Sequence, residues 1–422
     1  MEHDKSPLSD YCSIVKGLSY KGEYIHQEGP ALLGIGTIKE GGGFRPENVR
    51  TYGGSYKEEH VLRPGDVYVA LTSQDGFLIG SPAMVPKDFK GIGITTHHDA
   101  KVDWKIEDQV KRDFLFWLMH TYDFIRHCIN FSVGTTVYAT HGRDVERFFV
   151  PKELNQNQIS MTAILNSISE LEPILKSSRI LLEEQIKSVF RSWFVDFDPV
   201  KAKAEGRLPS GMDEDTAALF PDSFEDSELG PIPSGWTVGT IHDIAKQRKD
   251  MAKPDEFNDM LPYIGLEHMP RNSIALTEWG NSEGLKSNKF RFSKKDILFG
   301  KLRPYFHKVG PATLDGVCST DILVIQPIDE KSGGFLLPIL SSEHFVNFVS
   351  GITEGVGLPR TKWEHFKLYK IALPPVEIRE GFASIVEPML RNIESSIHQF
   401  RFMELTRDAL LTRLMSGELS VS

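Results

Sequence analysis

Two long stretches of the sequence carry apolar residues at spacings that alternate between four and three. The first runs from about Asn157 to Phe197, and the second follows Pro375. Such spacings average 3.5 residues, the period of a coiled-coil seam. The expected seam positions are Ile164, Ile168, Leu171, Leu175, Ser178, Leu182, Gln185 and Val189 in the first stretch and Val386, Leu390, Ile393, Ile397, Phe400, Glu404, Arg407, Leu411 and Leu414 in the second.

We therefore expect two long helices that pair with each other, although either one alone would also suit an ordinary helix packed on a core. Pro173 lies inside the first helix and predicts a kink or a break near Glu172. Pro388 lies in the first turns of the second, where proline is better tolerated.

The rest of the chain has mixed character. Strand-like runs such as Ala31–Ile38 and Asp66–Leu71 alternate with glycine-rich turns, and Val110–Ile129 has the apolar face of a helix. The pattern predicts α/β globular segments before each long helix.

These globular segments are an internal repeat. The matching stretches are Leu33–Gly36 with Tyr263–Leu266, Arg63–Val69 with Ser293–Phe299, Gly134–Val137 with Gly357–Arg360, and Phe149–Pro151 with Ala372–Pro374. A duplicated unit followed each time by a long helix suits a protein that reads two half-sites at a fixed separation. The expected boundaries are 1–152 for the first domain, 153–198 for the central helix, 199–235 for a connector, 236–373 for the second domain and 374–422 for the last helix.

The connector is rich in proline and acid, which predicts an extended, solvated segment. The N-terminus has no counterpart of Pro231–Trp236, which opens the second domain, so the first strand of the first domain is expected to be shorter or differently built.

Composition sets broad limits. A chain of 422 residues with 40% hydrophobic and 25% charged residues fits two or three globular domains. No apolar run approaches the roughly 20 residues of a membrane span, and no membrane association is expected. The three cysteines are far apart, which favours a reducing cytoplasm over a disulfide framework or a zinc site.

The net charge of −10 hides a segregation of charge. Lys286–Lys308 holds eight basic residues and one acid, a net of +7, whereas Asp213–Gly230 holds seven acids and no base. The basic segment is either a solvated face or a surface for a polyanion.

Motifs for catalysis are missing from the sequence. Gly300-Lys301 is followed by Leu302, so it is no phosphate loop, and no dinucleotide fingerprint or nucleophile elbow is found. We therefore expect no catalytic residue, no metal site and no cofactor in this chain.

Basic loops with aromatic residues are the positive signal, because lysine and arginine contact phosphates and an arginine fork can read guanine. Any one of them alone fits an ordinary solvated surface charge better than a contact to DNA, and the cluster in the second domain is the strongest signal. The DNA-binding candidates are Arg291, Lys294, Lys295, Lys301, Arg303, Tyr305, Lys308, Arg360 and Lys362 in the second domain and Lys39, Arg45, Lys57, Arg63 and Arg143 in the first.

The central helix ends in an aromatic cluster, which is either core of the helix pair or a dock for a partner. The candidates for a helix-pair or subunit interface are Ile164, Ile168, Leu171, Leu175, Leu182, Val189, Phe190, Trp193, Phe194, Val386, Leu390, Ile393, Ile397 and Phe400.

Several of these stretches resemble specificity subunits of type I restriction-modification enzymes. They are Phe190–Val200, Asp296–Pro304, Cys318–Asp321, Leu373–Pro375, Gly41–Arg45 and Gly80–Ala83. The resemblance implies an α+β fold of two similar α/β target-recognition domains, joined by two conserved helices in an antiparallel coiled coil.

The same resemblance implies a function without chemistry in this chain. Each domain would read one half of a split sequence in double-stranded DNA, and the helix pair would set the spacer. The chain would recruit two methyltransferase subunits, which use S-adenosylmethionine, and motor subunits, which use ATP and Mg²⁺ to translocate and cut DNA.

Two other functions compete with this one. A free-standing methyltransferase needs an adenine-pocket motif and a glycine-rich cofactor loop, and the sequence has neither. A tandem protein-binding scaffold with a coiled-coil spacer is excluded neither by the basic loops nor by the net charge of −10. Salt dependence separates it from a DNA-binding protein, because DNA affinity falls steeply as counterions are released.

Overall fold

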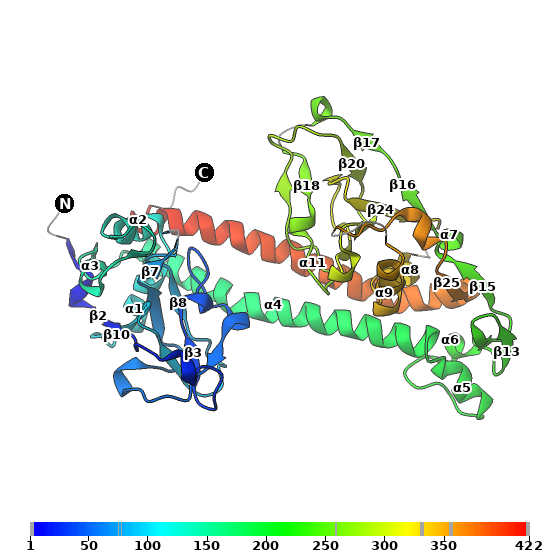
Figure 1. Ribbon diagram of the computed structural model, residues 1–422, viewed down its shortest axis with the longest axis horizontal. Coiled ribbons are helices and arrows are strands. Elements are labelled where there is room, and N and C mark those ends of the chain that lie inside the picture. Colours follow the sequence, from blue (N-terminus) through cyan, green and yellow to red (C-terminus); the bar gives the residue numbers. More distant parts are fainter. Residues whose placement is uncertain are drawn as a thin grey trace. The chain divides into compact units, whose positions relative to one another are not determined.

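The computed structural model describes residues 4–74, 76, 78–257, 260–329, 333–353 and 358–418. The chain divides into two units, which we describe separately (Figure 1). Unit 1 contains Met1–Leu171 and Met403–Ser422, and unit 2 contains Glu172–Phe402. A part of each long helix therefore belongs to each unit.

Unit 1 contains two four-stranded sheets, beside two smaller pairs of strands. The first is antiparallel, with the order β2-β10-β6-β8, and the second has the order β4-β3-β9-β5 with β3 and β9 parallel. The strands are β2 (Cys12–Lys16), β3 (Ala31–Leu33), β4 (Arg50–Thr51), β5 (Val61–Leu62), β6 (Val67–Ala70), β8 (Pro82–Met84), β9 (Gly93–Thr95) and β10 (Asp99–Trp104).

Unit 2 repeats this topology. Its antiparallel sheet has the order β16-β24-β21-β22, and its second sheet has the order β17-β20-β23-β18-β19 with β18 and β23 parallel. The strands are β16 (Ala245–Arg248), β17 (Met251–Ala252), β18 (Pro262–Ile264), β19 (Gly280–Asn281), β20 (Lys289–Phe292), β21 (Ile297–Gly300), β22 (Val309–Pro311), β23 (Gly316–Cys318) and β24 (Ile322–Pro327).

Strand alternation explains how each first sheet is covered on both faces. In unit 2, Ile297 and Phe299 of β21 pack with the helices, whereas Leu298 between them packs with Ile264 and Cys318 of the second sheet. In unit 1, Val67 and Val69 of β6 pack on helix α1 (Gln109–Leu118), and Tyr68 and Ala70 pack with Leu33 and Leu62. The repeat predicted from sequence is thus confirmed at the level of layers.

Both units close in the same way. A first strand pairs antiparallel with the strand that precedes the long helix, and the pairs are β1 (Lys5–Pro7) with β12 (Phe149–Pro151) and β15 (Thr237–Thr240) with β25 (Lys370–Leu373). With three residues against four, β1 is the shorter opening strand, as expected from the missing counterpart of Pro231–Trp236.

The shorter elements are capped locally. The predicted helix over Val110–Ile129 is two helices, because Thr121 accepts a hydrogen bond from the Phe124 backbone and starts a new one. The shorter helices and remaining strands are α1 (Gln109–Leu118), α2 (Tyr122–Asn130), α3 (Gly142–Val145), α5 (Asp198–Ala204), α6 (Glu214–Ala218), α7 (Ile241–Ile244), α8 (Gly333–Leu340), α9 (Glu343–Gly351), α10 (Trp363–Phe366), β7 (Thr72–Ser73), β11 (Tyr138–Ala139), β13 (Phe224–Ser227) and β14 (Gly230–Pro233).

The long helices α4 (Gln156–Phe194) and α11 (Val376–Leu414) have 39 residues each and pair antiparallel (Figure 1). In unit 1, the Gln158 side-chain amide donates to the carbonyl of Leu414 at 3.2 Å. In unit 2, the Arg179 guanidinium lies 5.3 Å from the Phe400 ring centre. Residues later in α4 contact residues earlier in α11, as in an antiparallel coiled coil.

The break expected near Glu172 is absent, because α4 continues through Pro173. Proline removes the hydrogen bond to the carbonyl four residues earlier. Pro173 and Ser169 are both exposed, so that carbonyl can bind water instead. Pro388 is likewise accommodated within α11.

The seam expected for α4 is correct at every second position. Four of the expected residues are buried or partly buried: Ile168, Leu175, Leu182 and Val189. Ile164 and Leu171 are 45% and 48% exposed, however, and the buried residues are Leu165, Arg179 and Ile186, each one step beyond an expected position. The spacing rule alone could not choose between the expected positions and the buried ones, because the buried set includes a charged residue, Arg179.

The residues expected at the α11 seam lie on the buried side of that helix. Val386, Ile393 and Ile397 are at most 2% exposed. Leu390 and Phe400 are partly buried. Because the apolar residues of α11 fall on one face without a buried charge among them, its heptad pattern could be read directly.

The segment 199–235 is not the extended connector that its prolines and acids predicted. It contains α5, α6 and the hairpin β13–β14, and it buries Val200, Phe220 and Ile232 in the core of unit 2. Its acids remain on the outside, so the charge pattern described a surface rather than a lack of structure.

The aromatic cluster at the end of α4 belongs to that same core. Trp193 and Phe194 are 5% and 8% exposed, and the Trp193 ring lies 5.1 Å from Phe220 and 5.7 Å from Phe382. Phe197 packs on Trp236 at the start of the second domain. The cluster therefore fixes the end of α4 to unit 2.

Candidate nucleic-acid interface

The basic segment of unit 2 is divided between the two ends of strand β21. Lys294 and Lys295 lie in the turn before Ile297–Gly300, and Lys301–Lys308 form the loop after it. A strand of four residues spans about 13 Å at 3.3 Å per residue. The segment is therefore two separate features and not one patch.

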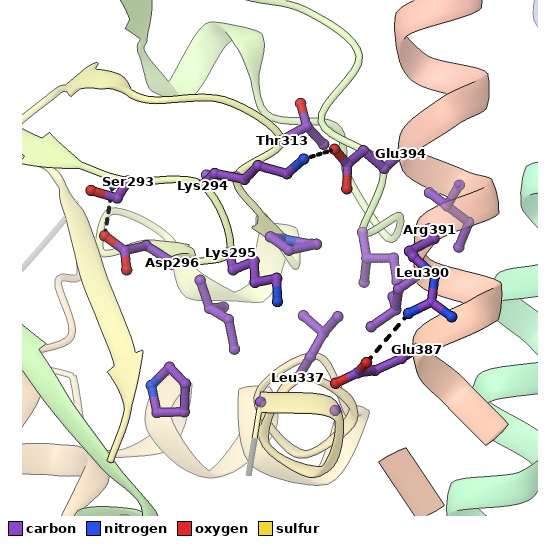
Figure 2. A pocket seen from close by; sticks show the side chains of 18 of the residues that line it. Ser293, Lys294, Lys295, Asp296, Thr313, Leu337, Glu387, Leu390, Arg391 and Glu394 are labelled. Atoms are coloured by element: carbon purple, nitrogen blue, oxygen red, sulfur yellow. Dashed lines mark hydrogen bonds and ion pairs between the residues drawn. The ribbon is translucent and has the colours of Figure 1, made fainter. Parts of the chain in front are cut away.

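The turn before β21 faces helix α11 across a cavity of about 410 Å³ (Figure 2). The Lys294 ammonium lies 2.5 Å from a carboxylate oxygen of Glu394 in α11, and Arg391 pairs with Glu387 at 3.4 Å. Figure 2 shows Lys295 directed into this cavity, whose lining includes Leu337 of α8. Lys294 is thus bound within the unit.

Lys295 has a left-handed backbone, with φ of 73°. The matching residue in unit 1 is Gly65, with φ of 89°. A lysine at a position that favours glycine costs on the order of 1–2 kcal/mol. The turn is held by Asp296, which is 5% exposed and accepts a hydrogen bond from the Ser293 backbone at 2.8 Å.

The loop after β21 combines bound and outward-facing cations. Lys301 lies 5.4 Å from the Phe290 ring, and burial lowers its pKa. Lys308 donates to the carbonyl of Leu266, and burial lowers its pKa as well. Both amines are engaged by the fold, so neither is fully available to a ligand.

Arg303 and Tyr305 are placed differently. Arg303 is the residue before the short 3-10 helix η8 (Pro304–Phe306), and its guanidinium lies 6.0 Å from the Phe306 ring. Tyr305 is 49% exposed. Arg271, which sequence reasoning missed, lies over the same Phe306 ring at 3.8 Å. Arg271 lies outside every charge run, so no sequence signal pointed to it.

Two further candidates in unit 2 are bound by acids. The Arg291 guanidinium lies 2.5 Å from Glu256, and that of Arg360 lies 3.3 Å from Asp321. Lys362 is exposed at the start of α10. These ion pairs make Arg291 and Arg360 weaker candidates for DNA binding, because a phosphate would have to displace the carboxylate from each arginine.

The candidates of unit 1 are all exposed, but they lie on separate loops: Lys39, Arg45, Lys57, Arg63 and Arg143. Lys57 pairs with Glu59 at 3.2 Å and Arg63 with Glu58 at 2.6 Å. Within the described residues Lys39, Arg45 and Arg143 form no ion pair, which makes them the stronger candidates.

Backbone hydrogen bonds identify equivalent positions in the two units. The Thr361 amide donates to the carbonyl of Lys301 at 3.0 Å, and the Thr140 amide donates to the carbonyl of Leu71 at 2.9 Å. Lys301 therefore corresponds to Leu71, and two residues further Arg303 corresponds to Ser73. The loop rich in basic residues in unit 2 has no basic residue at 71–78 in unit 1.

Among the residues that the structure describes, no cluster of histidine, cysteine, aspartate or glutamate is arranged to hold a metal ion. No helix in this part of the chain is long and apolar enough to cross a membrane. The chemistry on offer at the loops is therefore hydrogen bonding, charge and aromatic stacking.

Comparison with known sequences agrees with this chemistry. Residues 233–399 match the family described as Type I restriction modification DNA specificity domain. The chain is 25% identical over 327 residues to the type I restriction enzyme MjaIX specificity subunit of Methanocaldococcus jannaschii, covering 75% of this chain and 71% of that protein. It is 24% identical over 336 residues to the EcoDI specificity subunit of Escherichia coli, covering 74% and 71%.

The fold is also similar to a solved structure. The crystal structure of the type I restriction-modification system S subunit from M. genitalium aligns with a TM-score of 0.61 at 12% sequence identity, covering 97% of this chain and 95% of that chain. At this identity the likeness concerns the fold, and the sequence relatives carry the assignment. Residues 233–399 therefore match a Type I restriction modification DNA specificity domain, and about three quarters of the chain is similar to specificity subunits of type I restriction enzymes.

Proposed function

We propose that the two units read the two halves of a split target in double-stranded DNA, one recognition domain for each half. The observation that carries this proposal is the repeated topology with different side chains at equivalent positions. Lys301 and Arg303 in unit 2 correspond to Leu71 and Ser73 in unit 1. One fold that presents two sets of side chains suits the reading of two different sequences.

Binding and reading would divide between residue types. Cations without an internal ion pair, such as the exposed Arg45 in unit 1 and the partly exposed Arg303 in unit 2, suit phosphates and base edges. Lys294 and Arg291 are tied to acids within unit 2 and would contribute less. The positive contacts would come from a few loops, which reconciles DNA binding with a net charge of −10.

The helix pair would set the number of unread bases between the half-sites. A ruler must be continuous, and α4 and α11 are each an uninterrupted helix of 39 residues. Residues buried on both helices, such as Ile186 and Ile393, fix their register. DNA turns once in about 34–36 Å, so a fixed helix length would select a fixed spacer.

The outer surface of the helix pair would dock two methyltransferase subunits. In unit 2, several large apolar side chains of α4 and α11 remain exposed, among them Ile174 at 61%, Leu181 at 60% and Phe402 at 70%. Exposed apolar patches of this kind mark protein interfaces. The exposed Ile164 and Leu171, which are outside the seam, suit the same role.

Chemistry would belong to the partners. Methyltransferase subunits would use S-adenosylmethionine, and motor subunits would use ATP and Mg²⁺, whereas this chain would bind none of these. The division fits loops that offer groups for recognition, such as Arg271, Arg303 and Tyr305.

Methylation mapping tests this function. We would co-express the chain with a cognate methyltransferase subunit in a host that lacks adenine methylation, and sequence its genome for modified adenines. The proposal predicts methylation at one motif of two constant parts separated by a fixed number of unread bases. An assembled, cofactor-binding complex that methylates no such motif would favour the protein-binding scaffold instead.

A further inference from the structure

The loop after β21 holds two arginines against one aromatic ring. The guanidinium carbon of Arg271 lies 3.8 Å from the centre of Phe306, and that of Arg303 lies 6.0 Å from it. The exposed Tyr305 packs on the same ring, with the two ring centres 4.9 Å apart. A guanidinium that stacks on a ring keeps its N–H donors free at its edge.

The backbone around this ring is strained. Six non-glycine residues of the described chain have a left-handed φ, and three of them meet here: Asn272 at 57°, Arg303 at 50° and His307 at 51°. L-amino acids disfavour this conformation, although asparagine tolerates it better than arginine or histidine. Backbone strain of this kind persists where the surroundings enforce it, and it concentrates at functional sites.

Two hydrogen bonds enforce the strained geometry. The Asn272 amide donates to the carbonyl of His307 at 3.2 Å, and the Arg303 amide donates to the carbonyl of Pro359 at 2.8 Å. Ser273, next to Asn272, donates to Glu183 of α4 at 2.7 Å. The segment that carries Arg271 is thereby held against both the loop and α4, so the arginine has a defined position.

The charge of this stack is not used inside the protein. No carboxylate of the described residues forms an ion pair with Arg271 or Arg303, whereas Arg291 is paired with Glu256 and Arg360 with Asp321. Arg271 is exposed. Its donors are therefore open to an acceptor on another molecule.

We infer that Arg271, held over Phe306, reads a guanine in the half-site of unit 2. The inference rests on the proposed function and names a specificity residue for it. A guanine offers two acceptors in the major groove, and an arginine fork binds both. A phosphate accepts a cation in many orientations, so it gives no reason to fix Arg271 by stacking and a strained backbone.

Three variants of the full chain in its methyltransferase complex test the inference. Arg271→Ala removes the fork, Arg271→Lys keeps the charge but not the fork, and Arg207→Ala removes an exposed arginine of the same unit, paired with Glu205, as the control. Each complex is checked for assembly and thermal unfolding, and its methylated adenines are then mapped. Affinity is measured by competition with duplexes that carry each base pair at every position of the second half-site.

The expected result is loss of selectivity at one guanine of the second half-site. Discrimination against the other three bases should fall on the order of ten- to a hundredfold in both Arg271→Ala and Arg271→Lys, while the first half-site and the spacer stay unchanged. Arg207→Ala should keep the wild-type motif.

Three results would overturn the inference. One is a second half-site without a G·C pair, and another is an Arg271→Lys complex that keeps wild-type selectivity, as a phosphate contact would. The third is a uniform loss of affinity for all sequences in Arg271→Ala. If Arg271→Ala fails to assemble, Arg271→Lys still decides. Failure of the proposed function would look different, because the wild-type complex itself would then methylate no split motif.

Discussion

Insertion of four residues between Leu171 and Glu172 should lengthen the DNA spacer without changing either half-site. The chain passes from unit 1 to unit 2 at this point of α4. Four residues add about 6 Å of helix at 1.5 Å each and turn it by about 40° beyond one full turn. The seam with α11 is therefore nearly in phase after the insertion.

The size of the change follows from the rise of DNA. At about 3.4 Å for each base pair, 6 Å corresponds to at most about two base pairs, and to fewer where the helix is inclined to the DNA. We expect a spacer longer by one or two base pairs, measured by mapping methylated adenines in the assembled complex. Both constant parts of the motif should be the same as in the wild type.

A two-residue insertion at the same place is the matched control. It turns the rest of α4 by about 200°, so Arg179 and Ile186 would leave the seam, and we expect the helix pair and the complex to be lost. The ruler is refuted if the four-residue variant methylates the original spacer, or if its half-sites change.

Other predictions concern stability. Trp193→Ala should lower the free energy of unfolding by about 3–5 kcal/mol, because the Trp193 ring is 5% exposed in the core of unit 2. Phe402→Ala should leave thermal unfolding almost unchanged and weaken partner binding, because the Phe402 side chain is 70% exposed. Lys295→Gly should raise the free energy of unfolding by up to about 1 kcal/mol, since φ is 73° there, and a denaturant titration that showed a loss would contradict the strain. Burial lowers the pKa of His120 from 6.5 to about 4, so the unfolded chain takes up the proton first, and stability should fall as pH drops from about 6.5 towards 4. His120→Gln should flatten this part of the pH profile of unfolding, and an unchanged profile would refute the assignment to His120.

Much of the fold could be predicted because the apolar residues recur at regular spacings and the globular segments are repeated in the sequence. The 3.5-residue spacing located both long helices, and the repeat showed that the topology would occur twice. The α4 seam was only half correct because Arg179 is buried at a seam position. An apolar count cannot foresee a buried arginine that lies over Phe400 and near Glu183.

The candidate site was harder to predict because it depends on pairing. A run of eight basic residues looks uniform in sequence, yet the fold ties Lys294 to Glu394 and Arg291 to Glu256. Arg271 stands apart from the run and joins it only through Phe306. The prediction of an extended connector over 199–235, made from its proline and acid content, was wrong for a similar reason. Phe220 and Ile232 pack against residues that are distant in the sequence.

Exchange of one recognition domain tests the central claim most directly. Residues 236–373 would be replaced by the matching segment of a relative whose target has been mapped, and the methylated adenines of the assembled complex would be sequenced. The account predicts a hybrid motif, in which one half-site becomes that of the relative while the other half-site stays as it was. A motif in which both half-sites change, or in which neither does, would contradict the claim that each unit reads its own half.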